Sequence, residues 1–125
     1  MADLALDQSA LDQLLETIGG DREFLAELID TYLGDSPRLF GELRDGLAAG
    51  DATTVRRAAH TLKSTSASLG ANRLAATCRD IESAAGSGDL AGLAARAELA
   101  QGEFEGVAVA LRAVDGVGNR GSDGT

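Results

Sequence analysis

Apolar residues recur along most of the chain at intervals of three and four positions, which is the spacing of one face of an α-helix. Glycine followed by aspartate interrupts this pattern at residues 19–21, 50–51 and 88–89. Glycine ends helices in a left-handed conformation and aspartate caps the next helix, so these sites indicate helix boundaries. We therefore expect helices over residues 10–18 with Ser9 as the cap, from Asp21 to Gly50, from Asp51 to Gly70, over residues 72–85 and over residues 90–114.

The second expected helix contains an interruption, Gly34-Asp35-Ser36-Pro37. A proline behind a serine cap is compatible with a helix that restarts and equally with one helix that is kinked, so both interpretations stay open. Apolar positions continue at helical spacing on both sides of it. The residues that we expect to face inward are Phe24, Leu25, Leu28, Ile29, Tyr32, Leu33, Leu39, Phe40, Leu43 and Leu47.

The last expected helix has the most regular apolar pattern, from Leu90 to Val114. Such a stripe is typical of the seam of a helical bundle and also of a coiled-coil dimerisation surface. We prefer the bundle seam, because four helices of similar length with short connections already supply its partners. The predicted fold is all-α: an antiparallel four-helix bundle with a short additional N-terminal helix.

The composition agrees with a single helical domain and excludes some classes of binding partner. The chain has 125 residues, enough for one core, and we assign residues 1–115 to the bundle and 116–125 to a disordered tail. Eleven basic and 20 acidic residues give a net charge of −9, which argues against nucleic acid or an anionic membrane as partner. The single cysteine, Cys78, lies at core spacing and cannot form an internal disulfide. Without a long apolar run or a leader, we expect a soluble, cytoplasmic monomer.

The only histidine, His60, stands on the polar side of its helix. A helical projection gathers Val55, Ala58, Ala59, Leu62, Ser66 and Leu69 into one inward stripe. His60 falls on the opposite side, so its imidazole should face water. Its expected neighbours on the same outer face are Arg56, Lys63, Ser64 and Ala67.

An exposed histidine is usually only a solvated residue, but the charges around this one are unusual. Residues 52–79 contain no Asp or Glu, and they carry the basic residues Arg56, Arg57, Lys63, Arg73 and Arg79. This window makes a local positive surface on an acidic protein. We expect the imidazole to have no carboxylate partner, and on this expectation an acid capping the ring would rule out the function considered next.

Residues 60–71, HTLKSTSASLGA, resemble the signature of histidine phosphotransfer (HPt) domains. In that signature a His is followed by Leu two positions on, Lys three on, a small residue four on and Gly-Ala ten on. The resemblance extends to Arg57-Ala-Ala before the histidine and to Leu74, Cys78 and Ile81 after it. One position differs, because the family usually has Gly where this chain has Ser64.

The resemblance implies that His60 accepts a phosphoryl group, that Lys63 helps to hold it, and that position 64 is small so that a partner can approach. It also implies a phosphorelay carrier that exchanges the group with an aspartate on receiver domains of response regulators or hybrid sensor kinases. Phosphoryl transfer commonly uses Mg²⁺ held by carboxylates. Because we expect no acid near His60, the metal should come from the partner, and the chain should bind no cofactor or metal and not be an enzyme in its own right. We expect Arg56, Arg57 and Ala67 to contact the partner, with apolar residues near His60 forming the core of that contact.

Two other functions remain open at this point. The chain could be the phosphoacceptor domain of a chemotaxis-type histidine kinase, or a helical interaction module that docks a partner without carrying phosphate. The hydroxyl residues near His60, Ser64, Thr65, Ser66 and Ser68, could also suggest a Ser–His nucleophile. That arrangement needs an acid to orient the ring and an oxyanion site, and we reject it because the acid-free window supplies no such acid.

Overall fold

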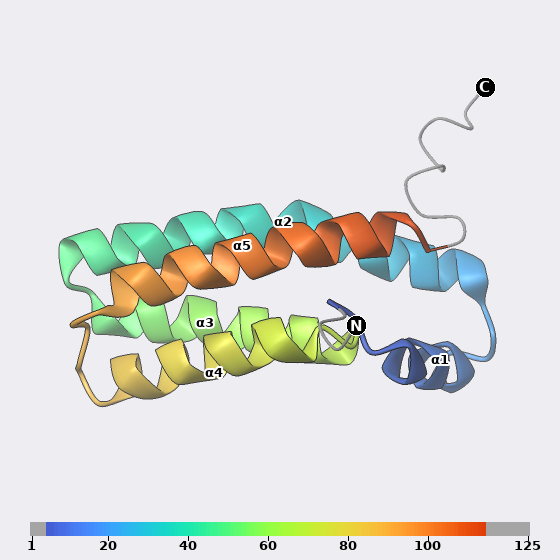
Figure 1. The fold of residues 1–125 in the computed structure, drawn as a ribbon, viewed down its shortest axis with the longest axis horizontal. Helices are drawn as coiled ribbons and strands as arrows, with labels where there is room; N and C mark the ends of the chain where they lie inside the picture. Colours follow the sequence, from blue (N-terminus) through green and yellow to red (C-terminus); the bar gives the residue numbers. More distant parts are fainter. Residues whose placement is uncertain (1–4, 115–125) are drawn as a thin grey trace, which may run out of the picture.

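The computed structural model describes residues 5–114, and in this range the chain folds into helices without any strand (Figure 1). The predicted all-α class is therefore confirmed. The predicted tail over residues 116–125 lies outside the described residues. The helices are α1 (Gln8–Thr17), α2 (Arg22–Ala49), α3 (Ala52–Ser68), α4 (Asn72–Gly86) and α5 (Leu93–Arg112).

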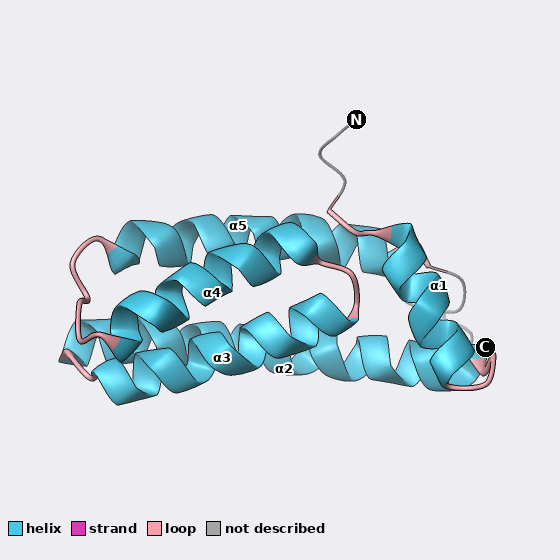
Figure 2. Cartoon of the chain, turned by 90° about the horizontal axis from the view of Figure 1, so that it is seen from below, coloured by secondary structure: helices cyan, strands magenta, loops and turns pink. Residues whose placement is uncertain are grey.

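The four longer helices lie side by side, and each packs against two others. α3 packs against α2 and most extensively against α4, while α5 packs against α2 and α4. In Figure 1, α2 and α5 form the upper pair and α3 and α4 the lower pair; Figure 2 shows α1 crossing one end of the group. Helix α1 makes its most extensive helix contact with α3. The arrangement places α3 diagonally from α5.

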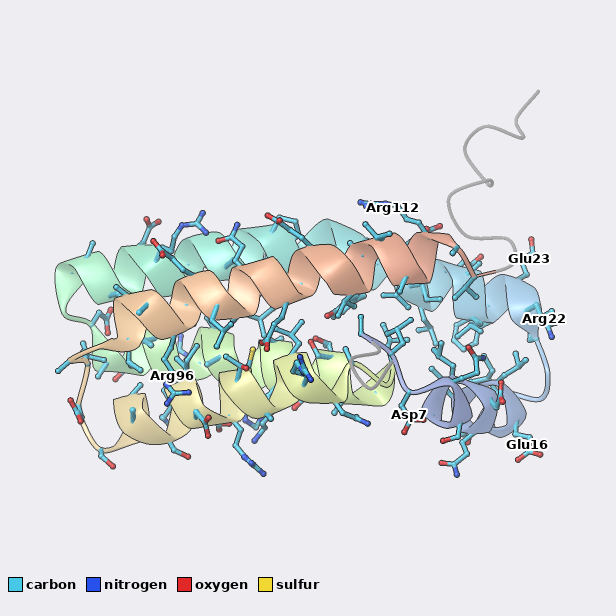
Figure 3. All side chains as sticks on the ribbon, in the orientation of Figure 1. Asp7, Glu16, Arg22, Glu23, Arg96 and Arg112 are labelled. Carbon is cyan, nitrogen blue, oxygen red and sulfur yellow. The ribbon has the colours of Figure 1, made fainter. Side chains whose placement is uncertain are left out.

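Two of the predicted caps are confirmed and two are wrong. Asp21 and Asp51 accept hydrogen bonds from the first turns of α2 and α3, as expected. Helix α1 is capped by Asp7, whose carboxylate accepts from the backbone N–H of Ser9, so Ser9 lies inside the helix (Figure 3 labels Asp7). Asp89 instead accepts from the backbone of Ala91 in a turn, and α5 begins later, after Gly92. Short polar side chains can serve a turn as well as a cap, so sequence alone did not separate the two uses.

Helix α2 runs without a break through Pro37. The restart left open from the sequence does not occur. Proline costs an interior helix one N–H donor and crowds the preceding turn. That cost is offset by burial on both sides, because Ile29, Tyr32, Ser36 and Leu39 face the core. Tertiary packing therefore carries the helix across a local breaker.

The core follows the apolar pattern closely, with one exception among the large side chains. Phe24 was expected to face inward but is 43 % exposed. Further along α2, Tyr32 and Phe40 both pack against Phe104 of α5, with ring centroids 5.7 Å and 5.6 Å apart. Cys78 is buried as predicted, and burial raises the pKa of its thiol to about 12, so the sulfur stays protonated.

Within residues 5–114, none of the helices combines the length and the apolar content needed to cross a bilayer. The same residues contain no group of three or more His, Cys, Asp or Glu side chains placed to hold a metal ion.

Candidate functional site

Helix α3 presents two chemically different faces. Its predicted inward stripe is buried throughout: Val55, Ala58, Ala59, Leu62, Ser66 and Leu69 are each at most 4 % exposed. The hydroxyl of Ser66 meets that of Tyr32 at 2.8 Å, so this polar member of the stripe is satisfied inside the core. The stripe fixes how α3 is rotated, and it turns His60 outward.

His60 is exposed as predicted, with 58 % of its side chain accessible. Its Nδ1 atom lies 2.8 Å from Oε2 of Glu82, which projects from α4. The carboxylate of Glu82 can only accept a hydrogen bond when it is ionised, so Nδ1 is the nitrogen that carries the proton. In the neutral ring the other nitrogen, Nε2, then has the free lone pair.

Lys63 shares the same carboxylate. Its Nζ lies 2.7 Å from Oε1 of Glu82, and the two side chains are 30 % and 18 % exposed. The hydrogen bond from Lys63, followed by that from His60 and the charges of both groups, lowers the pKa of Glu82 below its ordinary value despite partial burial. Glu82 therefore remains ionised near neutral pH and connects His60 to Lys63.

The expectation that His60 has no carboxylate partner is wrong. Residues 52–79 do lack Asp and Glu, but Glu82 reaches the imidazole from the neighbouring helix. The residues next to His60 in sequence therefore do not predict all of its neighbours in space. The argument against a carrier does not follow either, since the acid occupies Nδ1 and leaves Nε2 open. The same finding removes one reason for rejecting a Ser–His nucleophile, namely that no acid was available to orient the ring.

A geometric signal for this contact was present in the sequence. His60 and Glu82 lie the same number of residues from Ala71, on either side of the turn between α3 and α4. Arg56 and Gly86 are also equidistant from Ala71, and the Arg56 side chain lies against Gly86, with Cδ 3.4 Å from where a β-carbon would be. In an antiparallel helix pair such positions face each other. The missed residue could have been found by pairing the two helices across their turn.

The remaining predicted site residues are spread along the outer side of α3. Arg56, Arg57, Ser64 and Ala67 are all exposed. Arg57 lies near the start of the helix, where its charge contributes to a lowered pKa of Asp51, after the larger effect of hydrogen bonds from Thr54. The backbone carbonyl of Ser64 accepts a hydrogen bond from Ser68. The structure thus brings together His60, Lys63 and the unpredicted Glu82.

An apolar groove runs beside this site, between α1, α2 and α3. Its volume is about 390 Å³, and Thr61, the neighbour of His60, forms part of its wall. The other lining residues come from all three helices: Leu14, Leu28, Thr31, Tyr32, Asp35, Ser36, Arg38, Leu39, Thr65, Ser68 and Leu69.

Comparisons with known proteins identify a family that agrees with an outward-facing histidine on a packed helical domain. Residues 27–115 match the Hpt domain family, so the chain belongs to that family. It is a histidine phosphotransfer protein of phosphorelay signalling, in a family of carriers rather than classical enzymes.

A particular solved structure is also similar, the crystal structure of histidine-containing phosphotransfer protein B (HptB) from Pseudomonas aeruginosa PAO1. The sequences are 32 % identical, the TM-score is 0.80, and the match covers 86 % of this chain and 91 % of that one. A search of curated proteins found no significant match.

Proposed function

We propose that the chain is a phosphorelay carrier that accepts a phosphoryl group on Nε2 of His60 and passes it on to an aspartate. The donors and acceptors would be receiver domains of response regulators and hybrid sensor kinases. The observation that carries this proposal is the half-exposed imidazole whose Nδ1 is held by Glu82 while Nε2 is free. The four long helices would serve as an antiparallel four-helix bundle, with α1 as the additional N-terminal helix.

The bound carboxylate has a direct chemical use. In transfer from an aspartyl phosphate, the bond between phosphorus and the carboxylate oxygen breaks and one between phosphorus and Nε2 forms. Because Nδ1 keeps its proton, the ring becomes positively charged as the new bond forms. Glu82 stabilises that charge and fixes the ring in the reactive tautomer, in the way a buried acid supports a catalytic histidine. Return of the phosphoryl group to an aspartate reverses each change.

Lys63 supplies positive charge next to the moving group. Phosphoryl transfer depends mainly on positioning and on neutralising the negative charge of the transferred oxygens. The ammonium group of Lys63 is held within one helical turn of His60 by Glu82. We propose that it turns toward the phosphoryl oxygens once these are bound, and that Ser64 is small enough to leave them room.

The rest of the machinery would come from the partner. Glu82 is already engaged by His60 and Lys63, so we assign no metal or cofactor to this chain and expect Mg²⁺ on the receiver domain. Because receiver domains are the expected partners, we place the protein in the cytoplasm.

Docking would use two kinds of surface. The exposed side chains of Arg56 and Arg57 give the surface around His60 a positive charge that suits an acidic receiver pocket. The exposed Ala67 is small enough to let the receiver approach closely. The apolar groove beside Thr61 supplies a surface that an apolar helix of the partner can fill. We propose that the receiver contacts both.

Incubation with a phosphorylated receiver domain tests the proposal. The chain should gain phosphate that is labile in acid and stable in base, which is the behaviour of phosphohistidine. His60→Gln should abolish labelling while leaving the helical circular dichroism unchanged. Labelling of this variant would move the site elsewhere, and unlabelled wild-type protein that still binds the receiver would indicate a docking module.

Lys63→Ala separates charge neutralisation from ring orientation. We expect slower transfer or a shorter-lived phosphohistidine, measured by loss of label over time. Arg57→Ala, a change of an exposed cation three residues before His60 on the same helix, is the matched control and should affect receiver affinity more than the lifetime of the label. An unchanged rate and lifetime in Lys63→Ala would remove the role assigned to Lys63.

A further inference from the structure

Helix α5 has an uncharged outer stripe whose members are all exposed to solvent. A helical projection places six exposed residues on the side opposite its buried seam: Ala95, Leu99, Gly102, Gly106, Val109 and Ala113. Leu99 and Val109 are 51 % and 68 % exposed and are two of the three large apolar side chains exposed among residues 5–114. An apolar side chain exposed alone is ordinary, but a continuous stripe along one helix is typical of an interaction surface.

Packing within residues 5–114 does not require the two glycines in this stripe, although both border a shallow groove of about 150 Å³ that Ala5, Arg73 and Leu74 also line. A β-carbon added to Gly102 or Gly106 would meet no atom within 4 Å, and neither residue has a positive φ angle. Gly46 shows the contrasting case, because a β-carbon there would come within 2.9 Å of Val55 where α2 and α3 pack closely. A glycine inside a helix costs about 1 kcal/mol relative to alanine. Two glycines side by side on an exposed face therefore suit the close approach of another helix.

The stripe is symmetric about its own midpoint. Reversing it exchanges Gly102 with Gly106, Leu99 with Val109 and Ala95 with Ala113, so every position meets a residue of the same kind. A surface that matches its own reverse is what a twofold-symmetric antiparallel contact requires. We propose that the outer stripe of α5 packs antiparallel against the same stripe of a second copy of this chain, forming a reversible homodimer.

Charges beside the stripe support that register. On the side of α5 that faces α2, the order of charged residues is Glu98, Glu105 and Arg112. In the antiparallel arrangement this flank meets the same flank of the second copy, which brings Glu98 near its Arg112 at each end. Arg112 projects outward from the end of α5 in Figure 3. The two Glu105 side chains would approach each other at the centre and oppose the contact, which favours a weak dimer over a permanent one.

The dimer goes beyond the proposed phosphotransfer function and is compatible with it. Helix α5 packs against α2 and α4, and α3 lies diagonally across the group. Both copies of His60 would therefore stay accessible to receiver domains. The monomer expected from the sequence would be the dilute form of the protein.

Sedimentation velocity of the full chain over a range of concentrations tests this proposal. We expect a monomer that becomes a dimer as concentration rises, and a species that remains monomeric up to about 1 mM would overturn the proposal. Gly102→Gln and Gly106→Gln should each weaken the dimer about tenfold or more, because the side chain keeps the helices apart. Gly34→Gln is the matched control, since Gly34 also lies open in a helix but among charged neighbours such as Arg38.

All three glycine substitutions should raise the thermal stability of the monomer, so loss of the dimer cannot be confused with unfolding. Dimerisation that survives both stripe variants, or that is lost equally in Gly34→Gln, would contradict the assigned surface. Glu105→Gln should strengthen the dimer by removing the central repulsion. A weaker dimer in this variant would contradict the antiparallel register.

Cysteine cross-linking checks the direction of packing. In a Cys78→Ser background, the double substitution Leu99→Cys with Val109→Cys should give a covalent dimer on oxidation, because these positions face each other. Leu99→Cys alone should not, since the two copies of residue 99 lie at opposite ends of the contact. Efficient cross-linking by the single variant would indicate a parallel pair and overturn the proposal.

Discussion

The two faces of α3 depend on different kinds of interaction, although their residues are interleaved along one helix. Leu62 is fully buried and His60, two positions earlier, has 58 % of its side chain exposed. The inner face is determined by apolar spacing within one helix, whereas the outer face is completed by a residue of another helix, Glu82. The buried face therefore sets where the imidazole points, and the α3–α4 contact sets its protonation and charge. Substitutions on the two faces should have separable effects.

The largest expected effect on stability comes from the inner face. Leu62→Ala removes a fully buried side chain and should lower the free energy of unfolding by about 2–5 kcal/mol. Urea denaturation followed by circular dichroism measures this loss. The same folded variant should still accept phosphate at low temperature. A loss below about 0.5 kcal/mol would mean that the two faces do not differ as described.

The next largest effect is expected on the rate of phosphoryl transfer and comes from the outer face of α3. The change in unfolding free energy should be much smaller than that of Leu62→Ala. Glu82→Ala removes the acceptor of the His60 and Lys63 hydrogen bonds, and one charge-assisted bond of about 1.5–3 kcal/mol corresponds to roughly 10–100-fold in rate. We expect phosphorylation by a phosphorylated receiver to slow by that factor, measured by rapid-quench labelling.

Glu82→Gln is the matched control for this change. Its amide oxygen can still accept from Nδ1 but carries no charge to stabilise the phosphorylated ring. The rate should fall between those of the wild type and Glu82→Ala. Equal rates in all three proteins would remove Glu82 from the mechanism.

A smaller effect concerns acid stability. The pKa of Glu82 is lowered in the folded state from its ordinary value of 4.5, chiefly by the hydrogen bond from Lys63. A carboxyl with a lowered folded pKa stabilises the fold above the unfolded pKa, and this contribution is lost as pH falls through the folded pKa. The difference in unfolding free energy between wild type and Glu82→Gln should therefore be present at pH 7 and shrink steadily below pH 4.5.

The comparison with Glu82→Gln isolates this one carboxyl. Asp7 and Asp51 also have lowered pKa values, from hydrogen bonds by Ser9 and Thr54, and they act equally in both proteins. A stability difference that does not change between pH 7 and pH 3 would contradict the ionised bridge between α3 and α4.

The smallest effect is expected at the position where the chain departs from the family signature. Ser64→Gly removes an exposed hydroxymethyl group one turn from His60. Transfer should be unchanged or slightly faster, and helix stability should fall by about 0.5 kcal/mol or less. Ser64→Leu provides the opposite test, because a bulky side chain should hinder receiver docking. A large loss of transfer in Ser64→Gly would show that the hydroxyl contacts the phosphoryl group.

Much of the fold could be predicted because each helix buries its own apolar stripe. The seam from Leu93 to Leu111 is buried as predicted, and so are Leu74, Cys78 and Ile81 of α4. An error arises where one residue type has two structural uses, because Asp89 serves a turn instead of a cap. At Pro37 the sequence left two interpretations open, and the helix continues because packing on both sides outweighs a local break. Such outcomes depend on energies that no short stretch of sequence contains.

The sequence by itself determined which residues could do chemistry and on which side of their helix they lie. His60, Lys63 and the small residue at position 64 follow from spacing within one helix, since helical geometry relates nearby positions rigidly. Only the tertiary structure decided that His60 and Lys63 share one carboxylate, because Glu82 reaches them across the α3–α4 contact. Contacts between helices depend on how the buried faces pack, and that packing is a property of the whole core.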